Sequence, residues 1–192
     1  YLKADGTLAQ PALSWMDIRV AHPYEHTNPD VKYIVASSGY ITHRLTGEKK
    51  DTVANYEGVW PIDVDNWGWS EDPAAYEATG MPREMLFDLV MPGDILGYVT
   101  KEAAEATGFP QGLPVVATSN DKAVEGLGTG CMGDTTACIS LGTYTAAMME
   151  GKENLKDTKC VWPKFSCVPN KYLYDSNGIR RGMWTISWFR DI

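Results

Sequence analysis

The feature that most constrains the fold is the segment at residues 113–130, in which an apolar, β-branched run ends on polar residues and a glycine-rich, helix-like stretch follows. The run at residues 114–118 predicts a short strand, and Asp121 comes just after it. In an open α/β sheet, ligands bind in the crevice beyond the carboxyl ends of the strands, so this order exposes Asp121 where reacting groups are found. The plainer interpretation is that Asp121 only caps a helix.

A second segment, at residues 135–149, alternates well enough to predict two short strands joined by a turn at Gly142 and Thr143. The backbone amides of such a turn, together with the threonine hydroxyl, suit a phosphate group. Gly-Thr is also a common pair in ordinary turns, so the hairpin alone proves little. One carboxylate followed by one turn of the phosphate-binding type suggests phosphoryl transfer.

Composition excludes several classes of partner. The formal net charge of −8 argues against binding to nucleic acid and to anionic membranes, and no apolar run approaches the roughly 18 residues of a membrane span. The four cysteines have neither zinc-type spacing nor a nearby pair of histidines, so we expect no metal site and reduced thiols. These features are typical of an acidic cytoplasmic enzyme.

Local patterns indicate an α/β organisation. Apolar positions at residues 30–45, followed by Thr46 and Gly47, predict a helix that ends at a glycine. Residues 95–120 read as strand, helix and strand. The aromatic residues between these segments are interpreted as loop anchors rather than as platforms for a sugar; they are Tyr56, Trp60, Trp67 and Trp69.

Six segments, taken together, resemble the FGGY carbohydrate kinases. They are residues 112–130, residues 140–143, residues 182–191, a Trp-x-Asp-x-Arg element at residues 15–19, a Tyr-x-x-x-x-Leu-Thr-Gly-Glu element at residues 40–48, and Asp51 with Ala54. The resemblance implies an α/β fold of the ribonuclease H-like, actin-like ATPase type, as part of a two-domain kinase in which sugar and ATP meet between the domains.

The resemblance also implies a domain organisation. Residues 1–132 correspond to the C-terminal part of the first, sugar-binding domain, and residues 133–192 correspond to the start of the second, nucleotide-binding domain. Family members are well over twice this long, and their first phosphate loop and adenine-binding glycines have no counterpart here. We therefore expect an internal piece of a longer enzyme that does not turn over ATP alone. Relatives are often dimers, which leaves a homodimer open.

Site residues follow from the matched motifs. The resemblance implies ATP and Mg²⁺ as cofactors and a sugar or polyol as acceptor, a pentulose such as xylulose first among them. The implied roles are catalytic base for Asp121, acceptor binding for Trp15, Asp17, Asp121 and Lys122, and nucleotide binding for Gly142, Thr143 and Gly182. The residues after Gly182, Met183 and Trp184, depart from the small residues usual in the family.

Structural alternatives stand beside these roles. Trp15 is also suited to a core, Asp17 and Arg19 to an ion pair within a strand, and Lys122 to a solvated first helical turn. A second class of function is a non-catalytic, actin-like module that binds sugar or nucleotide. A binding module does not need a carboxylate at the position of Asp121, so that residue favours the kinase.

Overall fold

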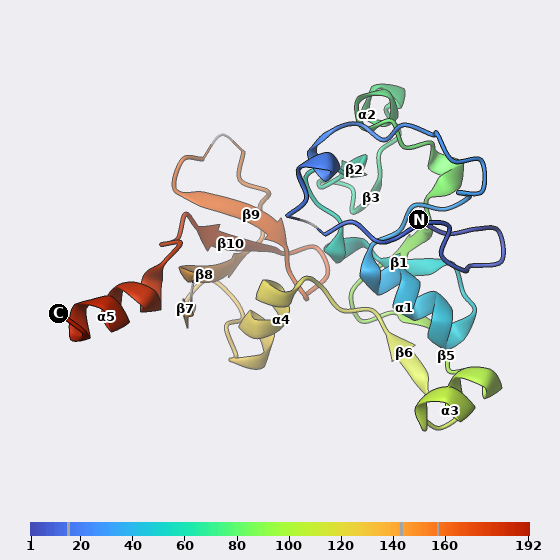
Figure 1. The fold of residues 1–192 in the computed structure, drawn as a ribbon. Helices are drawn as coiled ribbons and strands as arrows, with labels where there is room; N and C mark the ends of the chain where they lie inside the picture. Colours follow the sequence, from blue (N-terminus) through green and yellow to red (C-terminus); the bar gives the residue numbers. More distant parts are fainter. Residues whose placement is uncertain (15, 143, 157) are drawn as a thin grey trace. The chain divides into compact units, whose positions relative to one another are not determined.

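The computed structural model describes residues 1–14, 16–142, 144–156 and 158–192. The chain divides into two compact units, Tyr1–Thr118 and Ser119–Ile192 (Figure 1). This division precedes the helix at residues 121–128, whereas the boundary expected after residue 132 follows it. The later boundary stays a prediction about the domains of the full protein.

The first unit is built from short elements. In chain order these are η1 (Ile18–Ala21), α1 (Ser37–Thr46), β1 (Lys50–Thr52), η2 (Val53–Asn55), β2 (Ile62–Asp63), β3 (Gly68–Trp69), α2 (Pro73–Thr79), η3 (Arg83–Met85), β4 (Asp88–Val90), β5 (Ile95–Tyr98), α3 (Lys101–Thr107) and β6 (Pro114–Val116), where η marks a 3-10 helix. β1 pairs with β4 in parallel, while β2 with β3 and β5 with β6 are antiparallel. The expected strand, helix and strand at residues 95–120 are present, with the two strands antiparallel to each other.

The helix expected at residues 30–45 begins later than predicted, at Ser37. Val31 and Ile34, which supplied the first half of the apolar stripe, are buried, but from an extended segment. That segment pairs with the start of the chain, because the backbone of Leu2 exchanges hydrogen bonds with residues 32 and 33. The predicted end is confirmed, since Gly47 closes α1 with a left-handed φ of 76°.

The core of the first unit gathers around buried Val31, Ile34 and Met85. Around it, the Tyr56 ring lies edge-on to Trp60 and Trp69, with ring centroids 4.8 and 5.0 Å away. The indole N–H of Trp69 donates to the carbonyl of Phe87 at 2.8 Å. Three of the four rings expected to be loop anchors, those of Tyr56, Trp60 and Trp69, therefore pack against one another within the unit.

The second unit is one antiparallel sheet with two helices. Its elements are α4 (Asp121–Gly128), β7 (Ala137–Leu141), β8 (Thr145–Gly151), β9 (Val161–Phe165), β10 (Tyr172–Ser176) and α5 (Gly182–Arg190). The strands lie in the order β7, β8, β10, β9. The expected hairpin is confirmed, since β7 and β8 pair from Ala137 opposite Met149 to Leu141 opposite Thr145.

Helix α4 covers one face of this sheet. Its Ala123 packs with Met148 of β8 and Leu173 of β10 in a buried cluster, and a Cβ built at Gly126 would lie 3.6 Å from the Leu173 side chain. A helix with small residues on its inner face can approach a sheet closely. Direct packing on the sheet therefore fixes the position of α4, and with it Asp121, within the second unit.

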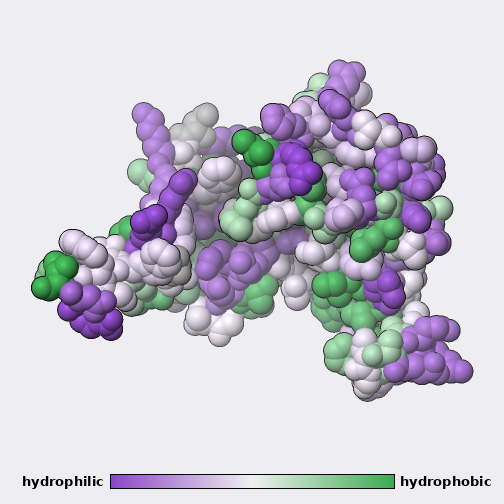
Figure 2. Space-filling view, in the orientation of Figure 1, coloured by the Kyte–Doolittle hydropathy of each residue, from purple (hydrophilic) through white to green (hydrophobic). Residues whose placement is uncertain are grey.

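Helix α5 differs, because large apolar side chains along it are exposed: Trp184, Ile186, Trp188 and Phe189, with Ile192 beyond its end. Figure 2 shows hydrophobic surface at that end of the chain. Within the described ranges, no helix combines the length and the hydropathy needed to cross a bilayer. The four cysteines, all of them in described segments, are not paired in disulfides.

A fully buried carboxylate, Asp51, ties the elements of the first unit together. Its Oδ2 accepts hydrogen bonds from Ser38 of α1 at 2.7 Å and from the Tyr56 hydroxyl at 2.8 Å, and its Oδ1 accepts the Thr52 N–H at 2.8 Å. Burial raises the pKa of Asp51 despite these donors. The folded state therefore holds the Asp51 proton more tightly, and this contribution to stability declines as pH rises through the raised pKa.

We expect Tyr56→Phe to lower the free energy of unfolding by about 2 kcal/mol, because it removes a donor from a buried carboxylate. Tyr76→Phe is the matched control, since the Tyr76 hydroxyl donates to the neutral carbonyl of Ser70 at 2.6 Å and its loss should cost only about 1 kcal/mol. Urea unfolding of the two variants measures the difference. Equal losses would show that the charge of Asp51 adds nothing.

Candidate functional site

Asp121 is the first residue of α4, and it is exposed. The cap of the helix is Asn120, whose side chain accepts the Ala123 N–H at 3.1 Å. Asp121 is therefore not the N-cap, as the plainer interpretation of the sequence would have it. One of its carboxylate oxygens accepts the Lys122 N–H at 2.8 Å, and it is otherwise open to solvent. The helix dipole favours a negative charge at this position.

Lys122, next along α4, turns toward the sheet. Its ammonium donates to Glu125 Oε2 at 2.8 Å and to Ser140 Oγ of β7 at 3.3 Å. The hydrogen bond with Glu125 is the main reason that the pKa of Lys122 is raised, and the charges of Glu125, Asp121 and Asp175 add to it. Lys122 is thus a cation held between helix and sheet rather than a freely solvated side chain.

The β7–β8 turn meets the start of α5. The Gly142 carbonyl accepts the Met183 N–H at 3.2 Å, and Thr145 exchanges backbone hydrogen bonds with Ile179 at 3.0 and 2.8 Å. A Cβ built at Gly182 would lie 1.9 Å from Thr145 Oγ1, so only glycine fits at this position. Two residues implied to bind nucleotide, Gly142 and Gly182, therefore lie together.

Asp17 has a local role in the first unit. It caps η1, with its Oδ1 accepting the Arg19 N–H at 3.0 Å and the Arg19 Nε–H at 2.9 Å. The side-chain hydrogen bond with Arg19, followed by the one from its backbone, lowers the pKa of Asp17 to about 2. The ion pair that formed the structural alternative exists, but it lies on a 3-10 turn rather than within a strand.

The structure thus groups some of the expected site residues within single units. Lys122 contacts Ser140 near the end of β7, and Gly142 contacts the first turn of α5, all within the second unit. Asp17 belongs to the first unit. Trp15 and Thr143 lie outside the described residues, so their expected roles stay predictions.

Sequence reasoning missed two residues that position Lys122, namely Glu125 and Ser140. The spacing of Lys122 and Glu125, three residues apart on a helix, was a signal that such a pair forms. Ser140 had no comparable signal, because its contact with α4 depends on how the helix lies across the sheet.

One described carboxylate, that of Asp121, is suited to share a Mg²⁺ with substrate phosphates. No group of three or more His, Cys, Asp or Glu side chains suited to a metal occurs among the described residues. Mg²⁺ usually binds through substrate phosphates, waters and one or two carboxylates, and exposed Asp121 is such a carboxylate.

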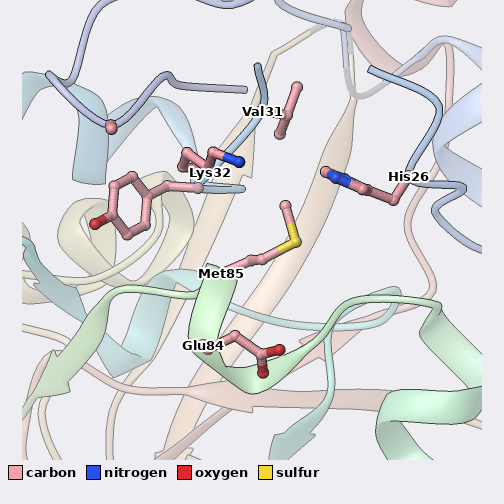
Figure 3. A pocket seen from close by; sticks show the side chains of 7 residues that line it. His26, Val31, Lys32, Glu84 and Met85 are labelled. Carbon is pink, nitrogen blue, oxygen red and sulfur yellow. The ribbon is translucent and has the colours of Figure 1, made fainter. Parts of the chain in front are cut away.

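The first unit has a depression on its surface, and its described lining residues are not those expected to form the site. Figure 3 shows Met85 pointing between Val31 and His26, with Lys32 and Glu84 at the rim. His26 is engaged with the Tyr24 hydroxyl at 2.8 Å. Among its described lining residues are none of those expected to bind acceptor or nucleotide.

These observations describe a mixed α/β protein. An exposed carboxylate begins helix α4, and a glycine turn contacts the start of helix α5. The model of the FGGY family of carbohydrate kinases, N-terminal domain, matches residues 5–128. The chain belongs to the FGGY family of carbohydrate kinases. The family and the α/β, actin-like fold class expected from the sequence are confirmed.

Relatives and solved structures agree with this assignment. The uncharacterized sugar kinase YgcE of Escherichia coli K12 is 59% identical over 191 residues, which are 100% of this chain and 39% of that protein. L-fuculokinase of the same strain is 29% identical over 116 residues, 60% of this chain and 24% of that protein. Xylulose kinase from Rhodospirillum rubrum has a TM-score of 0.72 at 21% identity, covering 83% of this chain and 32% of that one. The chain thus spans well under half the length of these proteins.

We expect Gly182→Ala to destabilise the second unit by about 1 to 3 kcal/mol, because the added methyl group overlaps Thr145 Oγ1. Gly128→Ala is the matched control, since a Cβ at this other helical glycine meets nothing within 4 Å. Helix propensity alone would make both changes stabilising, by up to about 1 kcal/mol. Chemical denaturation should therefore give opposite signs for the two variants, and a stabilised Gly182→Ala would contradict the close approach.

Proposed function

We propose that the full protein containing this chain is an ATP-dependent kinase that transfers the γ-phosphate of ATP to a hydroxyl of a sugar or polyol. A pentulose such as xylulose is the acceptor we place first. The observation that carries the proposal is the exposed carboxylate of Asp121 at the start of α4, in the same unit as the glycine turn at Gly142. Membership of a carbohydrate kinase family supports it.

In this proposal Asp121 is the general base. It accepts the proton of the acceptor hydroxyl as that oxygen attacks phosphorus, and a carboxylate suffices because a loose transition state needs proton removal only late. Because Asp121 is exposed, an acceptor can reach it. Its Oδ1 accepts the Lys122 N–H, which leaves Oδ2 to accept the proton of the substrate. Lys122 binds an acceptor hydroxyl or offsets charge on the transferred group.

The nucleotide side of the proposal uses Gly142, Thr143 and Gly182. The small size of Gly142 lets a phosphate approach the backbone, and the Thr143 hydroxyl donates to it. Contact between the Gly142 turn and the start of α5 supports a shared role for the two glycines. Mg²⁺ supplies charge neutralisation on the phosphates when bound.

Asp17 and Trp15 are proposed to contribute to acceptor binding. The full protein is proposed to be cytoplasmic, and its first domain is proposed to end after residue 132.

Asp121→Asn in the full-length protein should lower kcat by at least about a hundredfold, the low end of what a positioned base contributes, with ATP binding near normal. Asp134→Asn, an exposed aspartate of the same unit, is the control and should change kcat little. The assay is ATP-dependent phosphorylation across a panel of pentuloses, hexuloses and polyols. Asp121→Asn with more than a tenth of normal activity would remove this residue from the role of base.

Thr143→Val should cost about 2 to 4 kcal/mol of transition-state stabilisation, because it removes one donor to the γ-phosphate while keeping the shape of the side chain. Gly142→Val should cost more, because a branched side chain blocks the approach of phosphate to the backbone. Thr135→Val, just before β7, is the control. Steady-state kinetics with ATP varied give the comparison, and normal ATP kinetics in both turn variants would place the nucleotide elsewhere.

The acceptor panel also separates the kinase from a non-catalytic module. A module would bind a sugar or nucleotide, as measured by calorimetry, without transferring phosphate to any acceptor. In that case Asp121→Asn would leave binding unchanged and have no activity to lower.

A further inference from the structure

One buried carboxylate in the second unit is only half satisfied. Asp175 of β10 is 6% exposed, and its Oδ2 accepts a hydrogen bond from Lys164 of β9 at 3.2 Å. Its Oδ1 is buried and has no hydrogen-bond partner within the described part of the chain. Buried polar atoms are nearly always paired, because an unpaired one keeps the whole cost of its desolvation. Asp175 therefore calls for an explanation.

The same sheet face shows that a buried acid can be fully paired here. Leu173 lies opposite Glu150, and Asp175 is two residues further along β10, so Asp175 and Glu150 share a face. Glu150 receives the Gly133 N–H at 2.9 Å, the Ser166 hydroxyl at 2.7 Å and the Lys171 ammonium at 2.6 Å. Glu150 is a structural anchor. The open oxygen of Asp175 is not a general property of acids on this sheet.

This face is the one that α4 covers. Asp175 lies opposite Met148, and Met148 packs against Ala123 of α4. On the next strand Cys138 lies opposite Met148, so Ser140, two residues along β7, shares the face as well. Lys122 reaches from the first turn of α4 to Ser140. The ammonium of Lys122 thus lies over the face on which Asp175 is buried.

The acidic side chains around Lys122 differ in their exposure to solvent. Glu125, its hydrogen-bonded partner, is on an exposed part of α4, with 49% of its side chain accessible, whereas the side chain of Asp175 is 9% accessible and lies on a central strand. Asp121 lies beside Lys122 along α4, and Lys164 is paired with Asp175. The negative charge of Asp175 contributes to the raised pKa of Lys122. A buried charge is screened less than an exposed one, so Asp175 is the fixed member of this group.

We propose that Asp175 is a positioning residue of the acceptor site, whose buried carboxylate holds the Lys122 ammonium over the sheet beside Asp121; this rests on the proposed function of Lys122 in acceptor binding. Oδ2 is occupied by Lys164, which leaves Oδ1 without a partner in the described part of the chain. Asp175 touches no reacting atom in this role. It acts through its buried negative charge, which attracts the ammonium, whereas the side chain of Glu125 is half exposed to water.

The first test needs no catalysis. The reactivity of the Lys122 amine toward an acylating reagent is measured by mass spectrometry as a function of pH, in the wild-type chain, in Asp175→Asn and in Lys164→Met. Loss of the Asp175 charge should lower the pKa of Lys122 and raise its reactivity at least about twofold below that pKa. Loss of Lys164 removes a competing cation, so it should lower the reactivity of Lys122.

The two variants separate positioning from structure. Both break the same ion pair between Asp175 and Lys164, so a purely structural role predicts changes of the same sign. Changes in Lys122 reactivity of opposite sign in the two variants support the proposal. Changes of the same sign, or no change in either variant, overturn it. If Asp175→Asn fails to fold, Asp175→Glu keeps the charge, and the proposal then requires Lys122 reactivity within about twofold of wild type in that variant; a larger change overturns it.

The second test uses the full-length enzyme and its best acceptor from the panel. Asp175→Asn should raise KM for the acceptor at least about fivefold, with KM for ATP little changed, and the effect should vanish when Lys122 is already Met. Lys164→Met is the control for the lost ion pair and should leave KM for the acceptor within about twofold. An unchanged KM in Asp175→Asn, or an equal effect without Lys122, overturns the inference. If the wild type phosphorylates nothing, the proposed function fails, and amine reactivity still decides the coupling of Asp175 to Lys122.

Discussion

The packing of α4 on the antiparallel sheet is the contact on which the candidate site depends. Ala123 and Gly126 present small surfaces to Met148 and Leu173, so the helix lies close to the strands. That closeness brings Lys122 within hydrogen-bond reach of Ser140. A larger side chain at Ala123 would lift the helix and separate the charge on its first turn from the polar groups of the sheet.

The first unit depends on buried polar contacts more than on long regular elements. Its strands have at most four residues, as in β5, and such short ladders supply few backbone hydrogen bonds. Asp51 compensates by joining α1, β1 and the segment after η2 through three donors. The indole of Trp69 does the same for the chain before β4. Polar groups therefore fix the geometry of a unit whose hydrophobic core alone would leave its loops loosely placed.

Sequence patterns predicted those parts whose signal is local. The hairpin of β7 and β8 follows from period-two alternation, and the end of α1 follows from a glycine that adopts a positive φ. The predicted start of α1 was wrong. Apolar Val31 and Ile34 fit a helical stripe, but in the structure they belong to an extended segment that pairs with Leu2. Contacts such as Lys122 with Ser140 depend on strand register and helix placement, which no local pattern encodes.

The division into units bears on the proposed chemistry. Asp121 and Gly142 belong to one compact unit, and Asp17 belongs to the other. The family model ends at residue 128, the last residue of α4, yet the apolar face of this helix packs against the sheet that follows it. In the proposed reaction the geometry between the base Asp121 and the Gly142 turn therefore depends on the packing of α4 within its unit, whereas Asp17, proposed to bind the acceptor, belongs to the other compact unit. A substitution that loosens α4 would then impair phosphoryl transfer while leaving the structure around Asp17 intact, because the buried Asp51 network that holds the first unit does not include α4.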